Sequence, residues 1–94
     1  MVKHIVMWKF KSGEEENMNK FLNGLRSLKG QIPEIIDMEV KTNINPKDGY
    51  DAVLISTFNS LQDVEKYKVD PRHVLVSSLC KSIREDRASI DIEV

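Results

Sequence analysis

The feature that most constrains the fold is the stretch of residues 2–10, which is apolar on both faces of the strand that it would form. Successive side chains of a strand point to opposite faces. One face would carry His4, Val6, Trp8 and Phe10, and the other Ile5, Met7 and Lys9. A strand with two apolar faces lies in the middle of a sheet that is covered on each side. A chain of 94 residues can cover one side with its own helices, so we expect a second copy of the chain to cover the other.

The composition of the chain narrows the class of protein. Ninety-four residues predict a single domain over residues 1–94. The net charge of −1, from 14 basic and 15 acidic residues, gives no electrostatic reason to expect nucleic acid or an anionic membrane as a partner. The single cysteine, Cys80, excludes an internal disulfide. We find no apolar run of membrane-spanning length and no signal-peptide pattern, and therefore expect a cytoplasmic protein.

The first half of the chain then alternates between helical and strand periodicity. Ser12 and Glu15 form a capping-box pattern ahead of a helix whose apolar residues recur from Met18 to Leu28, and Gly30 is its expected stop. Residues 36–44 predict a strand with one polar face, which is typical of a sheet edge. Residues 45–49 are rich in turn formers, and residues 50–58 predict a strand that is again apolar on both faces.

The second half predicts two helices and a last strand. Ser60 and Asp63 form a cap pattern for a short helix, and Asp70 with Pro71 marks the start of the next one. Residues 84–87 form a charged connector, and residues 88–94 an edge strand. The side chains expected to face inward from these three elements are Leu61, Val64, Tyr67, Val74, Leu75, Leu79, Ile83, Ala88, Ile90, Ile92 and Val94.

The order of elements, β-α-β-β-α-α-β, is the split β-α-β pattern of a ferredoxin-like α+β fold with a four-stranded antiparallel sheet. Residues 2–10 and 50–58 would be the central strands, with helices on one face only. We expect a small apolar ligand pocket between sheet and helices, lined by Val6, Trp8, Leu25 and Leu54. The uncovered face would form the interface of a homodimer, a dimeric α/β barrel, through Ile5, Met7, Val53 and Ile55.

The sequence resembles the stress-responsive A/B barrel (Dabb) domain family over nearly its whole length. The resemblance lies in V-K-H-I-V at residues 2–6, K-F-K at residues 9–11, G-Y at residues 49–50 and Y-K-V-D-P-R-H at residues 67–73. It implies small ferredoxin-like subunits that pair into a dimeric barrel, most of them without an assigned activity. One departure is Asp70, which stands where the family pattern often has histidine before the proline.

A more distant resemblance, to the olivetolic acid cyclases of plants, implies a set of catalytic residues. Those enzymes close a linear polyketide without cofactor or metal, and they use a tyrosine and a histidine at the positions of Tyr67 and His73, with a first-strand histidine at the position of His4. A neutral imidazole near a helix N-terminus is suited to be a general base, and a tyrosine hydroxyl can orient a substrate oxygen. Each residue also has a structural interpretation, with His73 bonded to Asp70 in a helix cap, Tyr67 in the core with its hydroxyl at the surface, and His4 a satisfied strand histidine.

Three functions remain open from the sequence. The chain is a homodimer that binds a small organic ligand, or a cofactor-independent cyclase, lyase or isomerase acting on an aromatic or polyketide-like substrate, or a structural module that binds a partner protein. We expect no cofactor. A metal site built from the two histidines and Asp70 has no motif spacing, and Asp70 is better explained as a cap. Cys80 falls among helical core positions and is expected to be a small buried hydrophobe.

Overall fold

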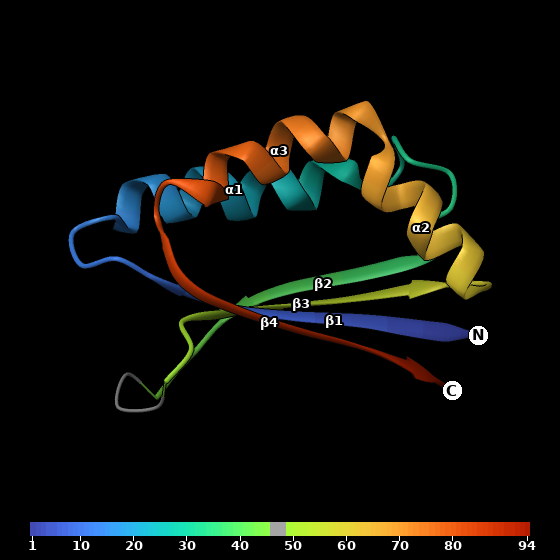
Figure 1. Cartoon of the computed structure of the whole chain (residues 1–94), viewed down its shortest axis with the longest axis horizontal. Helices are drawn as coiled ribbons and strands as arrows, with labels where there is room; N and C mark the ends of the chain where they lie inside the picture. The colour runs from blue at the N-terminus through green and yellow to red at the C-terminus, as the bar shows by residue number, and fades with distance from the viewer. Residues whose placement is uncertain (46–48) are drawn as a thin grey trace.

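The structure is a computed structural model that describes residues 1–45 and 49–94, and it has helices packed on one face of a sheet (Figure 1). The expected turn at residues 45–49 therefore lies partly outside the described residues. The elements are β1 (Val2–Phe10), α1 (Glu15–Leu28), β2 (Asp37–Thr42), β3 (Ala52–Phe58), α2 (Leu61–Val69), α3 (Pro71–Lys81) and β4 (Arg84–Glu93). Within the described residues, no helix combines the length and the apolarity that crossing a membrane requires.

The sheet has the strand order β2-β3-β1-β4, and all three strand pairs are antiparallel. This confirms the ferredoxin-like fold, with β1 and β3 in the centre and β2 and β4 at the edges. β4 begins at Arg84, so residues 84–87 are not a connector as the sequence suggested but the first part of the strand. A bulge between Lys9 and Phe10 shifts the β1–β4 register there.

The core lies between the sheet and the helices. The β1 residues Val6 and Trp8 are almost fully buried, and so are Phe21 and Leu25 of α1. The rings of Trp8 and Phe21 meet edge to face with centroids 5.1 Å apart, a favoured aromatic geometry. This confirms that the helices cover the sheet face that carries His4, Val6, Trp8 and Leu54.

The inward side of α3 differs from the expected one. Val74, Leu75 and Leu79 are exposed, and the helix instead turns Val76 and Cys80 toward the core. The reason is its close approach to α1 at Gly24, where an added Cβ would lie 3.0 Å from a methyl group of Val76. Such an approach favours small side chains at the contact, and the larger leucines are left outside.

The faces of β4 are also the reverse of those expected. Ala88, Ile90 and Ile92 lie opposite Met7, Ile5 and Lys3 of β1, on the sheet face that no helix covers. Residues opposite each other in an antiparallel pair share a face. Ser89 and Asp91 lie opposite Val6 and His4 and therefore face the helices. Val94 follows the strand and is 62% exposed.

The helix caps give a matched stability test. The Ser60 side chain accepts a hydrogen bond of 3.2 Å from the Asp63 backbone N–H. Among the described residues α1 has no side-chain cap, so the expected capping box at Ser12 is wrong. We expect Ser60→Ala to lower the free energy of unfolding by about 1 kcal/mol, because it removes a cap bond. Ser12→Ala should leave it unchanged. Urea denaturation measures both, and equal effects would contradict the assignment of the caps.

Candidate functional site

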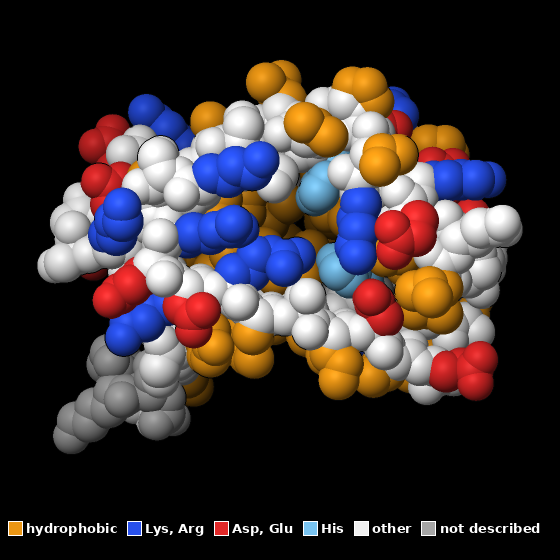
Figure 2. All heavy atoms as spheres, viewed as in Figure 1, with side chains coloured by type: hydrophobic (Ala, Val, Ile, Leu, Met, Phe, Trp, Pro, Cys, Tyr) orange, Lys and Arg blue, Asp and Glu red, His pale blue; other side chains and the backbone are white. Residues whose placement is uncertain are grey.

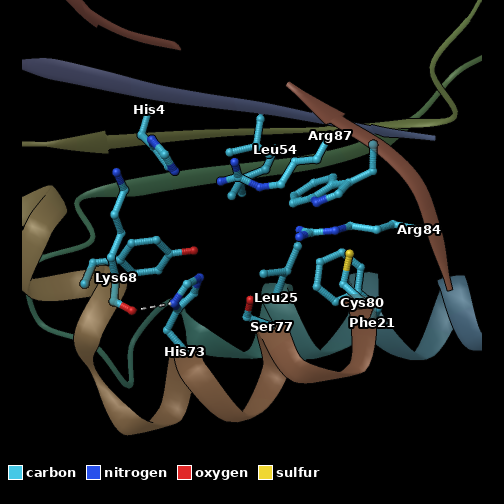
Figure 3. Close-up of a pocket in the computed structure, with 13 residues that line it drawn as sticks. His4, Phe21, Leu25, Leu54, Lys68, His73, Ser77, Cys80, Arg84 and Arg87 are labelled. Atoms are coloured by element: carbon cyan, nitrogen blue, oxygen red, sulfur yellow. Dashed lines mark hydrogen bonds between the residues drawn. The ribbon is translucent and has the colours of Figure 1, made fainter. Parts of the chain in front are cut away.

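A cavity of about 320 Å³ lies between the sheet and α1, α2 and α3 (Figure 3). Its inner wall is apolar, and its mouth carries polar and basic groups. The residues that line it are His4, Val6, Trp8, Phe21, Leu25, Leu54, Tyr67, Lys68, His73, Ser77, Cys80, Arg84 and Arg87. The cavity therefore brings together the three candidate catalytic residues of the sequence and all four of its candidate pocket residues.

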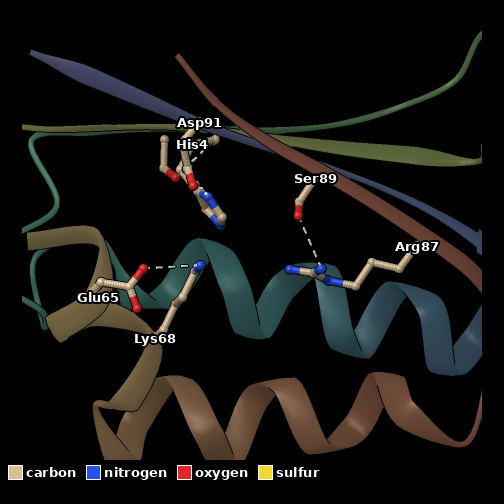
Figure 4. Close-up of polar contacts among 7 residues, drawn as sticks. His4, Glu65, Lys68, Arg87, Ser89 and Asp91 are labelled. Atoms are coloured by element: carbon tan, nitrogen blue, oxygen red, sulfur yellow. Dashed lines mark hydrogen bonds and ion pairs between the residues drawn. The ribbon is translucent and has the colours of Figure 1, made fainter. Parts of the chain in front are cut away.

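His4 is fixed in the cavity wall by an acidic partner. Its side chain is 3% exposed, and Nδ1 lies 2.6 Å from Oδ1 of Asp91 on the neighbouring strand β4 (Figure 4). Nδ1 therefore donates to the carboxylate, which leaves Nε2 as the free ring nitrogen. Burial lowers the pKa of His4, and although Asp91 acts in the opposite direction the imidazole stays below its ordinary pKa.

Tyr67 of α2 has an unusual environment for a tyrosine. It is fully buried, and its hydroxyl has no hydrogen-bond partner among the described residues. Its ring lies between those of His4 and His73, with centroid distances of 6.2 and 4.3 Å. Burial raises its pKa, so the group is a neutral hydrogen-bond donor. The expectation of a surface hydroxyl is wrong, and a buried unpaired donor in a cavity wall is free to bond a ligand.

His73 near the start of α3 is held in one tautomer. Its Nδ1 lies 3.1 Å from the backbone carbonyl of Lys68, and a carbonyl only accepts, so Nδ1 carries the proton. The other ring nitrogen points into the cavity (Figure 3). Burial lowers the pKa of His73 and favours the neutral imidazole. The expected bond to Asp70 is absent, because Asp70 caps α3 by accepting from Arg72.

Four groups at the site were missed by the sequence analysis. The sequence pattern predicts that Asp91 points away from the helices and that Arg84 and Arg87 lie in a connector, and it assigns Lys68 no more than an inward-facing stem. The apolar alternation of β4 did not reveal its orientation, because the uncovered face of this sheet is apolar as well. One sequence signal could have revealed Asp91: a histidine in a central strand needs a polar partner on the strand beside it.

The remaining polar groups do not form a metal site in the part of the chain that the structure describes. Within residues 1–45 and 49–94, no three histidine, cysteine, aspartate or glutamate side chains cluster as metal ligands would. Asp70 lies in its cap, with its carboxylate 2.8 Å from the Arg72 guanidinium. Cys80 is buried, and burial raises the pKa of its thiol, which disfavours the reactive thiolate.

The two histidines of the cavity wall, His4 buried and His73 half-buried, predict an acid-sensitive fold. Both have a lower pKa in the folded protein than the ordinary 6.5, so the unfolded chain binds more protons below that pH. The contribution of the neutral histidines to the free energy of unfolding is therefore complete above about pH 6.5. It is lost as the pH falls through this value toward the pKa of the folded state. Urea denaturation at pH 7.5, 6.5 and 5.5 should show this decline, and His73→Asn should make it shallower. Asp70, whose pKa the hydrogen bonds from Arg72 lower to about 2, loses its contribution only at much lower pH. A flat profile from pH 7.5 to 5.5 would contradict the neutral state of both imidazoles.

Comparisons with known proteins place the chain in a family. A dimeric protein of unknown function with a ferredoxin-like fold from Bacteroides fragilis is 33% identical, with a TM-score of 0.92 over 99% of this chain and 95% of that one. A Dabb family protein from Mesorhizobium loti is 21% identical, with a TM-score of 0.82 over 99% and 95% of the two chains. A hydroxynitrile lyase from Passiflora edulis is 20% identical, with a TM-score of 0.86 over 99% and 92%. These two likenesses concern the fold alone.

A search of curated proteins found no match. The model of the Dabb family, described as the stress responsive A/B barrel domain, matches residues 2–94. That match spans every helix and strand, including those that form the cavity. The chain therefore belongs to the stress-responsive A/B barrel domain family.

Proposed function

We propose that the cavity is the active site of a cofactor-independent acid–base enzyme, a cyclase, lyase or isomerase that acts on a small organic substrate. The observation that carries this proposal is the buried, unpartnered hydroxyl of Tyr67 beside two neutral imidazoles. Leaving a buried donor unpaired costs about 1–3 kcal/mol. That cost is offset when a substrate oxygen enters the cavity and accepts the bond.

His73 is the proposed base. Its Nδ1–H is committed to the Lys68 carbonyl, so the lone pair on the other ring nitrogen can take a proton from a substrate C–H or O–H group. When the C–H lies next to a carbonyl, the electron pair moves to the carbonyl oxygen, and Tyr67 stabilises this oxyanion by donating to it. Return of the proton from His73 to another atom of the enolate completes an isomerisation. In a ring closure the enolate carbon instead attacks a second carbonyl carbon of the substrate, whose π bond breaks, and the oxygen of that carbonyl takes the proton from His73. His4, oriented by Asp91, supports the charge and the position of the substrate.

The same residues suit a lyase. Removal of a hydroxyl proton by His73 lets the oxygen form a carbonyl as the bond from carbon to a leaving group breaks, with the electron pair leaving on that group. The likeness to the hydroxynitrile lyase from Passiflora edulis makes hydroxynitriles one class to test. Linear polyketides are the other class, from the resemblance to the plant cyclases.

The direct test is a turnover assay with both substrate classes. Carbonyl and cyanide release from hydroxynitriles, ring closure of short linear polyketides, and exchange of acidic C–H groups in D₂O are followed by NMR. We expect one of these reactions to exceed the rate in buffer and to require no added metal or cofactor. If small apolar probes bind the cavity and none of the reactions is accelerated, the protein is a ligand-binding protein and the catalytic proposal is wrong.

We also propose that the chain works as a homodimer through its uncovered sheet face. Ile55, Ile5 and Ile90 lie side by side across β3, β1 and β4 on that face, next to a row of Val53, Met7 and Ala88. Ile90 is 59% exposed and Met7 37% exposed in the single chain. Glu39 and Lys41 lie beside these rows on β2. An apolar centre with a charged edge is typical of an interface, and the relative from Bacteroides fragilis is described as dimeric.

A single charge in that face should separate the subunits. We expect Ile90→Asp and Val53→Asp to lower the mass measured by light scattering from twice 10.8 kDa to 10.8 kDa, because a carboxylate would be buried without a partner. Val74→Asp is the matched control, since Val74 is an exposed apolar residue on α3. The proposed interface is wrong if both sheet variants stay folded with an unchanged mass.

A further inference from the structure

The mouth of the cavity is basic. Lys68 lies at one side of it, and Arg84 and Arg87 reach in from the other (Figure 3). The space-filling view shows blue Lys and Arg side chains around a hollow with an orange apolar floor and both histidines at its edge (Figure 2). The chain as a whole is close to neutral, with a net charge of −1. The positive charge at this opening therefore comes from the placement of these three side chains and not from the net charge of the chain.

These charges are poorly neutralised by the protein. Among the described residues, no aspartate or glutamate lines the cavity, and the nearby carboxylate of Asp91 is bonded to His4. Lys68 forms an ion pair with Glu65 at 3.5 Å (Figure 4). The Arg87 guanidinium has a side-chain contact of 3.4 Å with the neutral Ser89 hydroxyl, and no ion pair of Arg84 or Arg87 is seen in the described parts of the chain.

Arg87 is also close to the reacting groups. Its positive charge acts to lower the pKa values of His4, Tyr67 and His73 alike. With both imidazoles neutral, the arginines and the lysine set the potential inside the opening. In a site walled by apolar side chains, such a potential attracts an anion more strongly than it would in open water.

We propose that the ligand is an organic acid, whose apolar body lies against Trp8 and Leu54 and whose oxyanion head binds Arg84 and Arg87. This deepens the proposed function and rests on it, since it names the chemical class of the substrate for the same cavity. Guanidinium groups bind carboxylate and phosphate oxygens through paired N–H donors. Lys68 adds a third positive charge across the opening. The shared chemistry is an oxyanion on an apolar body, and carboxylate and phosphate are its two sources.

Trp8, the only tryptophan of the chain, lies in the cavity wall, so its fluorescence reports occupancy directly. The probes are 3-phenylpropionate, phenyl phosphate and the neutral 3-phenylpropan-1-ol, titrated into the full chain at low salt and checked by calorimetry. We expect at least one acid to bind about tenfold or more tightly than the alcohol, because charge-assisted hydrogen bonds are the stronger ones. The acid that binds more tightly identifies the head group. Added salt should weaken the binding of the acids and leave the binding of the alcohol unchanged.

Three variants locate the effect. Arg84→Gln and Arg87→Gln should each lower the affinity for the preferred acid about tenfold and leave the affinity for the alcohol unchanged. Lys66→Gln is the matched control, because it removes one positive charge from the exposed side of α2 and Lys66 does not line the cavity. It should change neither affinity.

The outcomes separate the two proposals. Equal binding of acids and alcohol, unchanged in both arginine variants, would overturn the organic-acid inference and leave the catalytic proposal standing. Binding of none of the probes, with constant Trp8 fluorescence, would overturn the organic-acid inference, and the turnover assay would decide the catalytic proposal by itself. An equal loss of acid binding in Lys66→Gln and Arg87→Gln would show a general effect of charge, and would overturn the assignment of the head group to the arginines.

Discussion

His73→Ala should lower turnover by about 100-fold or more and leave the cavity able to bind small apolar ligands. General acid–base catalysis by one positioned side chain contributes on this scale. His73 is the histidine whose free nitrogen is best defined, since its Nδ1–H is held by the Lys68 carbonyl at 3.1 Å. The measurement is kcat for whichever reaction the substrate screen identifies, with probe binding followed through Trp8. A pure binding protein would keep its affinity and have no turnover to lose.

His73→Asn separates the chemical role of His73 from its structural one. The asparagine amide can still donate to the Lys68 carbonyl, but it has no basic nitrogen. We expect this variant to unfold at nearly the same urea concentration as the unchanged protein and to lose as much activity as His73→Ala. If His73→Asn keeps the activity, the histidine positions other groups and the base lies elsewhere in the cavity, with His4 as the remaining imidazole.

The fold could be predicted from the sequence because two strands with two apolar faces allow few arrangements. β1 and β3 had to be central strands. The strand predicted over residues 36–44 has one polar face and therefore had to be at an edge. The same argument fails for β4. When both faces of a sheet are apolar, the alternation of apolar and polar residues does not show which side of the strand lies against the helices and which lies on the uncovered face. Ile90 could equally well have pointed to the helices, and only the register with Ile5 decides it.

The helices show a similar limit. Periodicity predicts α3 and its cap at Asp70, but the helix has two stripes that could face inward, and hydrophobicity favours the more apolar one. The structure turns the smaller side chains inward because α3 lies against α1 at Gly24. Which side of a helix packs against another helix depends on the room for side chains at the contact, and hydrophobicity alone does not predict it.

The candidate site could likewise be predicted only in part. His4, Tyr67 and His73 could be proposed because a family resemblance singled them out, and the structure places them around one cavity. The partner Asp91 and the two arginines follow from the register of β4, so they could not be placed before that register was known. The basic opening is thus a property of the fold and of no single motif.

Tyr67→Phe should change stability and activity in opposite directions. The hydroxyl of Tyr67 is buried without a partner among the described residues, so removing it relieves an unpaired donor and should raise the free energy of unfolding by about 1 kcal/mol. The same change removes the proposed donor to the substrate oxyanion and should lower kcat by about 100-fold. Urea denaturation and the turnover assay are made on the same preparation.

Tyr50→Phe is the control for this prediction. Its hydroxyl is exposed and donates to the Asp86 carboxylate at 3.1 Å, so its loss should affect stability little and turnover not at all. If Tyr67→Phe destabilises the protein, the hydroxyl has a partner in the folded state and is not held free for a ligand. If it stabilises the protein and leaves turnover unchanged, the free hydroxyl is a packing defect and the oxyanion donor must be another group. A more stable and less active variant would mean that the chain keeps a costly buried hydroxyl for its reaction, as expected where active sites trade stability for function.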